Sequence, residues 1–277
     1  MKTKKLSSKK KYPYYIAPPI KEMLNKGREK VVDKDWDRVY LIDGNEGSGK
    51  SLLGLQLGYY LDPTLNLDRI TFSGDEFSKA IDKAKKGECI IFDEAFNGLS
   101  STGATSKMNR FIVRKLMECR QKNLFIIIIL PTFFLLQKYA AIFRSKALFH
   151  VYATRRGDRG YYRVYNELNK KILYINGVKL YSYAKPYIQK SFRFSNIYPI
   201  DEQEYRNKKS ESLKDNPDDR IVEKYYFFFG VMCKLLKQKF KFPYTGMEGY
   251  LKEHNLTIDD GTIGRIVGKI PITSHSA

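Results

Sequence analysis

Short apolar runs and helix-period patterns alternate along the chain from Asp37 to about Thr154. Runs of consecutive apolar residues are typical of strands that are buried on both faces of a parallel sheet. The predicted strands are Val39–Ile42, Arg69–Phe72, Cys89–Phe92, Leu124–Leu130 and Ala147–Tyr152. The predicted helices between them are Ser51–Leu61, Phe77–Lys85, Asn109–Lys122 and Phe134–Ala141. This alternation predicts an α/β fold with a mostly parallel, doubly wound sheet. We place this domain at residues 31–200, with its core at 36–155.

The pattern changes after the last of these strands. Tyrosine-rich segments flank short polar turns between residues 160 and 195, and Asn176-Gly177 is a hairpin signal. We therefore predict an antiparallel β-meander that is appended to the core sheet. Its tyrosines and arginines fit cross-strand packing and contact with nucleic acid equally well. Residues 201–219 are almost wholly polar and charged, which predicts a charged linker or an exposed helix end.

Both ends of the chain differ from this core. Residues 1–30 are rich in lysine and predict a basic N-terminal arm, either a disordered tail or a strap on DNA or on a neighbouring subunit. Helical periodicity returns in residues 220–277, which predicts a small C-terminal helical domain. The expected helices are Ile221–Lys239, Met247–His254 and one from Asp259 or Asp260 to Lys269. Such a set fits a DNA-binding helix-turn-helix and also a plain packing bundle.

Composition and charge narrow the class of protein. The chain has 277 residues, 43% of them hydrophobic, and a net charge of +20 at neutral pH. The charge favours nucleic acid, an anionic membrane or acidic protein as partner, although a basic surface also serves solubility. Three scattered cysteines indicate a reducing compartment. The longest apolar run, Leu124–Leu136, is broken by Pro131 and is too short to span a bilayer. We expect a soluble, cytoplasmic protein without a membrane span.

A glycine-rich motif follows the first predicted strand. Residues 44–51 form a complete phosphate-binding loop between a strand and a helix. Its glycines let the backbone turn tightly, so that successive N–H groups face one anion at the positive end of the helix. We expect Lys50 to reach the β- and γ-phosphates of ATP and the Ser51 hydroxyl to hold Mg²⁺. The nucleotide-binding candidates are Gly44, Asn45, Glu46, Gly47, Ser48, Gly49, Lys50 and Ser51.

Two acids follow the third predicted strand. Asp93 and Glu94 come directly after the apolar run Cys89–Phe92. Hydrolysis of a bound triphosphate needs an aspartate near Mg²⁺ and a group that orients water. We expect Asp93 to bind the metal or its water shell and Glu94 to polarise the attacking water. The pair favours an ATPase over a kinase of small metabolites.

Further candidates complete the catalytic set. Thr132 ends the central strand beside the strand of the phosphate loop, which makes it a candidate sensor of the γ-phosphate. Phosphoryl transfer also needs a cation on the developing charge, often from a neighbouring subunit. Arg144 ranks first for that role, since it follows a helix and precedes the last core strand. The other candidates are Arg110, Arg114, Arg120, Arg155 and Arg156.

With these motifs, the chain resembles the P-loop ATPases of the additional-strand, catalytic-glutamate division. It looks most similar to the FtsK/HerA-type DNA-pumping branch, to zonular-occludens-toxin-like phage ATPases and to viral genome-packaging ATPases. The matching segments are Gly44–Ser51, Glu88–Glu94, Asn109–Lys122, Leu124–Leu130 and Phe143-Arg144. Pro131-Thr132 stands where the FtsK/HerA branch commonly has glutamine. The resemblance implies ATP and Mg²⁺ as cofactors, a ring of identical subunits, and work in a host cytoplasm or a virion.

The sequence therefore leads to one preferred function and three alternatives. We expect an ATP-hydrolysing translocase that pumps or packages double-stranded viral DNA, with a portal or capsid protein as a possible further partner. The first alternative is a replication helicase or helicase loader. The others are a DNA-binding regulator that uses ATP as a switch and a small-molecule kinase.

Overall fold

The computed structural model describes residues 12–93, 95–96, 102–214, 217–254 and 256–269. The chain divides into two compact units at the boundary between Ser210 and Glu211. Each unit has its own hydrophobic core, and the two are described separately below. Among the described residues, no helix combines the length and the apolar character that a membrane crossing requires.

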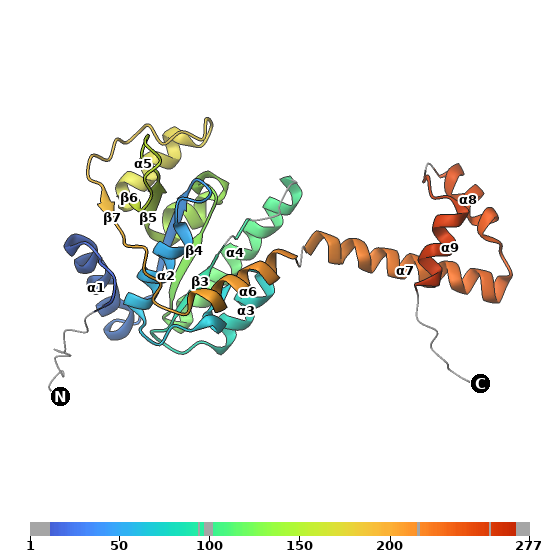
Figure 1. Ribbon diagram of the computed structural model, residues 1–277, viewed down its shortest axis with the longest axis horizontal. Coiled ribbons are helices and arrows are strands. Elements are labelled where there is room, and N and C mark those ends of the chain that lie inside the picture. The colour runs from blue at the N-terminus through green and yellow to red at the C-terminus, as the bar shows by residue number, and fades with distance from the viewer. Residues whose placement is uncertain (1–11, 94, 97–101, 215–216, 255, 270–277) are drawn as a thin grey trace. The chain divides into compact units, whose positions relative to one another are not determined.

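A seven-stranded mixed sheet forms the centre of the first unit (Figure 1). The strand order is β2-β3-β4-β1-β5-β6-β7. The first five strands in that order pair in parallel, whereas β6 and β7 pair antiparallel. The strands are β1 (Arg38–Gly44), β2 (Ile70–Thr71), β3 (Cys89–Phe92), β4 (Phe125–Ile129), β5 (Ser145–Tyr152), β6 (Tyr161–Tyr165) and β7 (Phe192–Arg193). This architecture confirms the predicted α/β fold with a mostly parallel sheet.

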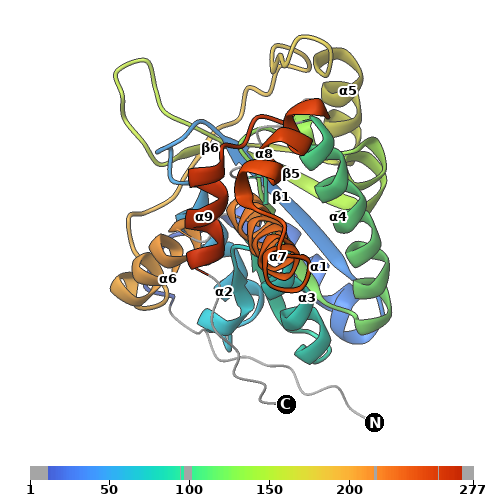
Figure 2. The same ribbon diagram turned by 90° about the vertical axis from the view of Figure 1, so that its right-hand side faces the viewer.

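Helices cover both faces of this sheet, as Figure 2 shows for α2 and α6 on one side and α4 and α5 on the other. The first face carries α1 (Pro18–Asp33), α2 (Lys50–Leu61) and α6 (Glu202–Lys214). The second face carries α3 (Gly74–Lys83), α4 (Thr102–Lys122), the π-helix η3 (Tyr139–Arg144) and α5 (Glu167–Gly177). Two short 3₁₀ turns, η1 (Leu67–Arg69) and η2 (Phe133–Leu135), lie in the connections.

Successive side chains of a strand point to opposite faces of the sheet, so one short apolar run contributes to the hydrophobic cores on both faces. Tyr40 and Ile42 of β1 belong to the core under α1 and α2. Val39 and Leu41, which alternate with them, belong to the core under α3 and α4. All five residues of β4 are buried. Since each fully buried aliphatic side chain contributes about 1.5–3 kcal/mol, the central strands dominate the stability of this unit.

Two predicted elements of the first unit have different bounds in the structure. The predicted arm 1–30 is too long, because residues 18–33 form α1 and bury Leu24 and Val31 against the sheet. Residues 1–11 lie outside the described residues. The predicted helix Phe134–Ala141 is divided between η2 and η3.

The predicted meander at 160–195 is wrong in its centre. Residues 167–177 form α5 instead of strands, and only β6 and β7 pair antiparallel there. The Asn166 side chain caps this helix by accepting a hydrogen bond from Asn169 N. Leu173 is buried against the core sheet, and Asn176-Gly177 ends the helix rather than turning a hairpin. A cap and the buried side chains of Lys170 and Leu173 thus outweigh the hairpin signal.

Of the two alternatives for residues 201–219, the structure favours the exposed helix over an irregular linker, because most of the segment is helical. Residues 202–214 form α6, and α7 (Pro217–Phe240) begins three residues later. In the second unit, α7 is followed by α8 (Tyr244–Glu253) and α9 (Asp260–Gly268), which agrees with the predicted helices. The core of this unit is small and is formed by Cys233, Met247, Ile263 and Val267. Its assignment as a helix-turn-helix stays a prediction.

Candidate functional site

The carboxyl ends of the parallel strands meet at one edge of the sheet, and the chain places its candidate residues there. The loop 44–51 joins β1 to α2, Asp93 directly follows β3, and Thr132 follows β4. Because β4 pairs with both β1 and β3, these segments are neighbours in space. This edge is where open α/β sheets bind ligands.

The backbone of loop 44–51 needs its glycines. Gly44, Gly47 and Gly49 have φ angles of 135°, 68° and 99°, a region that other residues rarely adopt. A Cβ at Gly44 would also collide with the Val151 carbonyl. The helix α2 starts at Lys50, directly after Gly49, which has no side chain to cap it. Its first-turn N–H groups therefore face the loop and are available to an anion.

Lys50 lies folded over this loop. Its Nζ atom donates hydrogen bonds to the carbonyl oxygens of Gly44, at 2.6 Å, and Asn45, at 3.1 Å. Burial lowers the pKa of Lys50, while the charges of Asp43 and Asp93 act in the opposite direction. The Ser48 hydroxyl tightens the turn by donating to Asn45 O at 2.7 Å. The loop thus brings a cation close to the backbone N–H groups at the start of α2, a combination that suits a phosphate group.

Asp93 and Ser51 share one cation. Nζ of Lys209, on α6, lies 3.1 Å from Ser51 Oγ and 3.3 Å from Asp93 Oδ2. The hydroxyl of Tyr205, one helical turn earlier, donates to the same Asp93 Oδ2 at 2.6 Å. Burial and the charge of Asp93 raise the pKa of this tyrosine. The structure thus brings together the two residues that the sequence predicts as metal ligands.

These two oxygen ligands fit a divalent cation. Mg²⁺ prefers oxygen atoms and is usually held by one or two carboxylates together with substrate phosphates. Asp93 is buried, and its Oδ1 atom has no hydrogen-bond partner among the described residues. A buried carboxylate oxygen without a partner is costly, so a further ligand at this position is favourable.

A second buried acid, Asp43, forms a network beside the loop. Its Oδ1 atom lies 2.9 Å from His150 Nδ1, and its Oδ2 atom accepts hydrogen bonds from the Tyr183 hydroxyl and from Phe133 N. The Tyr183 hydroxyl also lies 2.9 Å from Thr132 Oγ1. The predicted sensor Thr132 is therefore at the expected edge and is tied to the strand of the phosphate loop. Sequence reasoning missed this network because its members are distant in the chain.

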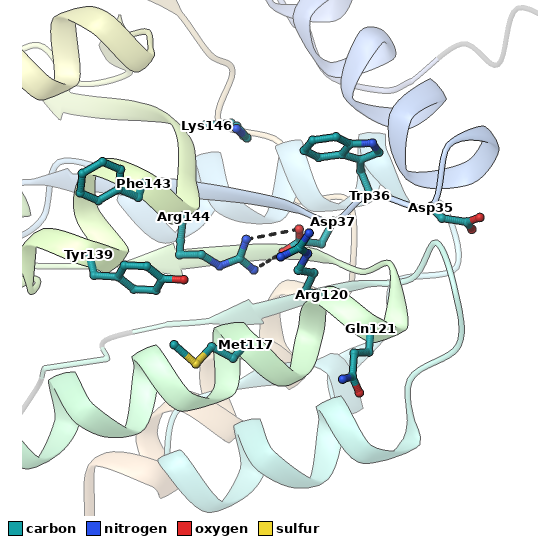
Figure 3. Close-up of a pocket in the computed structure, with 10 residues that line it drawn as sticks. All are labelled: Asp35, Trp36, Asp37, Met117, Arg120, Gln121, Tyr139, Phe143, Arg144 and Lys146. Atoms are coloured by element: carbon teal, nitrogen blue, oxygen red, sulfur yellow. Dashed lines mark hydrogen bonds and ion pairs between the residues drawn. The ribbon is translucent and has the colours of Figure 1, made fainter.

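The structure places Arg144 at the opposite edge of the sheet (Figure 3). Its guanidinium forms an ion pair with Asp37, with Nη2 and Oδ2 separated by 2.5 Å, and donates to Leu116 O at 2.6 Å. Asp37 directly precedes β1, and Arg144 directly precedes β5. This geometry ties the amino ends of two strands together and gives Arg144 a structural role. Its predicted role as a finger on the phosphate of a neighbouring subunit stays a prediction.

Aromatic side chains line a groove beside this ion pair. The groove measures about 760 Å³ and lies between α4, η3 and the segment that precedes β1. Trp36, Met117, Tyr139 and Phe143 contribute exposed apolar surface to it. The groove lies at the amino ends of the strands, away from loop 44–51.

Other residues near the loop were not predicted. The guanidinium of Arg159 is the side chain nearest to the space beside Gly47, at 3.9 Å from the position of an added Cβ, and Phe194 packs over Gly49. Tyr205 and Lys209 could have been found from their spacing of four residues, which puts both on one face of a helix. Glu94 lies outside the described residues, so its predicted role stays a prediction.

Comparison with known proteins adds no family to this picture. The chain matches no protein-family model, and no curated protein matches it.

Proposed function

We propose that this protein is a Mg²⁺-dependent ATPase of the P-loop class that couples ATP hydrolysis to the movement of double-stranded DNA. One observation carries the proposal. Ser51 and Asp93 come from two separate motifs, yet both contact a single cationic group, Lys209 Nζ. A position between these two oxygens that attracts a cation is what a shared metal site requires.

Each residue of the site has a role in this reaction. The N–H groups of loop 44–51 and the Lys50 ammonium would bind the β- and γ-phosphates. Ser51 and Asp93 would hold Mg²⁺, which would withdraw negative charge from the phosphate oxygens. Glu94 would orient and deprotonate the attacking water, and Thr132 would contact the γ-phosphate.

The strand order supports the resemblance to the additional-strand ATPases. β4 lies between β1, which leads to the phosphate loop, and β3, which leads to Asp93. The loop, the acidic strand end and the intervening strand thus occur together, as that division implies. The members of this division that the chain most resembles move DNA, and the net charge of +20 suits a partner with a phosphate backbone. A ring of identical subunits follows from the same resemblance.

Nucleotide binding is the first test. Equilibrium binding of a fluorescent ATP analogue should weaken on the order of 100-fold in Lys50→Ala, because a charge-assisted contact to phosphate is lost. Lys79→Ala removes an exposed lysine on α3 and serves as the matched control, with unchanged affinity expected. Equal affinities in wild type and Lys50→Ala would refute the site.

Coupling to DNA is the second test. ATP hydrolysis should be stimulated by duplex DNA, and DNA affinity should fall steeply with salt because phosphate contacts release counterions. Stimulation by single strands alone would favour the helicase. Hydrolysis that responds to neither form would remove DNA movement from the proposal and leave the ATPase.

A further inference from the structure

The helix α6 is held firmly against the candidate metal position. Tyr205 is buried in the same hydrophobic core as α2, and its ring lies 5.9 Å from that of Phe72. Nζ of Lys208 donates to the carbonyl oxygens of Leu67 and Ile70, at 2.8 and 2.7 Å. Tyr205 OH and Lys209 Nζ lie on the same face of α6. Because of this packing, both groups contact Asp93.

These two groups contact the oxygen atoms that would bind Mg²⁺. Both Tyr205 and Lys209 contact Asp93 Oδ2, and Lys209 also contacts Ser51 Oγ. A metal ion bound by the same oxygens would lie about 2.0–2.1 Å from each of them. Like charges repel strongly at such separations in a partly buried site, so the ammonium and the metal ion exclude each other.

The position of α6 in the chain gives this competition a consequence. Lys209 lies two residues before Glu211, where the second compact unit begins. The last turn of α6, up to Lys214, thus belongs to that unit, and α7 begins at Pro217. A helix that contacts the metal ligands at one end is therefore continuous with the C-terminal unit at the other.

We propose that Lys209 and Tyr205 make α6 a built-in competitor for Mg²⁺, which leaves Asp93 when the metal binds and so couples the nucleotide site to the C-terminal unit. The inference rests on the proposed function, because it assigns the metal to Ser51 and Asp93. When Mg²⁺ takes these oxygens, α6 loses the contacts of Tyr205 and Lys209 with Asp93 and Ser51, and its attachment at this point loosens although Lys208 still binds Leu67 O and Ile70 O. Conversely, any partner of the C-terminal unit that draws α6 away favours metal binding.

Direct metal binding tests the competition. Mn²⁺ affinity of the ADP-bound protein, measured by electron paramagnetic resonance, should increase on the order of tenfold or more in Lys209→Met, because a like charge is removed from the site. Arg206→Gln is the matched control: this arginine is exposed on the same helix and pairs with Glu202. An unchanged or weaker Mn²⁺ affinity in Lys209→Met would overturn the competition.

A second measurement uses the wild-type chain and does not depend on the variant's folding. Addition of Mg²⁺ to the ADP-bound protein should accelerate hydrogen exchange of the α6 amides, and α1, on the same sheet face, should show no such change. Unchanged α6 protection at saturating Mg²⁺ would overturn the release of the helix. Failure of ADP to bind both with and without Mg²⁺ would instead count against the proposed function, so the two failures are distinguishable.

Discussion

The buried carboxylates at the two edges of the parallel sheet are bound by different kinds of groups. At the amino edge, Asp37 faces the guanidinium of Arg144, and the pair also binds the backbone of α4. At the carboxyl edge, Asp43 and Asp93 are held mainly by hydroxyl groups, a histidine and one lysine. In addition, Asp93 Oδ1 lacks a partner among the described residues.

This difference separates a structural edge from one that can exchange ligands. A buried carboxylate that faces arginine is satisfied in a fixed geometry, and breaking the pair leaves an unpaired charge. Hydroxyl and ammonium donors on a carboxylate can be exchanged for a metal ion, because Mg²⁺ binds carboxylate oxygens. Removal of a group at the carboxyl edge should therefore change ligand binding or turnover, whereas removal at the amino edge should change stability.

The largest effect is expected for Glu94→Gln at the carboxyl edge. ATP binding should persist, because the amide keeps the size of the side chain. Turnover should fall by about 10²–10⁴-fold, the range for loss of a general base. A steady-state phosphate-release assay measures this, with Glu29→Gln on the exposed face of α1 as the control. Normal turnover would remove Glu94 from its role.

At the amino edge, Arg144→Met should destabilise the fold by about 3–5 kcal/mol, because Asp37 is left buried and unpaired. Urea denaturation gives the free energy of unfolding, and Arg156→Met provides an exposed control. The double variant Asp37→Asn with Arg144→Met should recover part of the loss. Weakened ATP affinity in a folded Arg144→Met protein, with stability unchanged, would reverse our assignment of the two edges.

The pH dependence of the free energy of unfolding tests the environment of Lys170, which lies at the amino edge of the sheet. This buried lysine donates to Ala141 O, Ser145 O and Ser145 Oγ, and burial lowers its pKa to about 8. Since its ordinary pKa is 10.5, the unfolded chain holds more protons than the folded chain between these values. The contribution of Lys170 to the free energy of unfolding therefore rises with pH from about 8 to 10.5.

As the pH rises from about 8 to 10.5, the free energy of unfolding of the wild type should increase by up to about 3 kcal/mol relative to that of Lys170→Met. Denaturation curves at pH 8 and at pH 10.5 measure the difference between the two proteins. Parallel pH profiles would mean that Lys170 keeps its ordinary pKa in the fold.

The smallest effect is expected for Tyr183→Phe. The substitution removes one hydroxyl that binds Asp43, Thr132 and Phe133 N, which should cost about 1–2 kcal/mol of stability. Because Thr132 loses its anchor, kcat should fall several-fold while ADP affinity stays unchanged. If kcat does not respond, Thr132 does not act through this network.

The sequence predicts the carboxyl edge better than the rest of the site. Cys89–Phe92 and Phe125–Ile129 are apolar on both faces, so their burial and strand character follow from local pattern alone. The glycines of loop 44–51 are likewise required by the backbone. Such residues can be predicted from the sequence, because the local apolar pattern or the required backbone conformation determines each of them.

Tertiary contacts decide what the sequence does not show. The α6 segment looks like a linker because it has few apolar residues, and it is held on the sheet by the buried ring of Tyr205 and by the hydrogen bonds of Lys208. Arg144 has the position expected of a finger, yet its partner Asp37 is 107 residues away in the chain. Likewise, the capping role of Asn166 outweighs the strand-like tyrosines that follow β6.

The most direct test of the shared metal position is a double-variant cycle on the Mg²⁺-dependent gain in ATP affinity. Wild type, Ser51→Ala, Asp93→Asn and the double variant would each be titrated with ATP, with and without Mg²⁺. If both side chains hold one metal ion, either substitution removes most of the gain and the double variant loses little more. Additive losses, or a full Mg²⁺ gain in Asp93→Asn, would contradict the account.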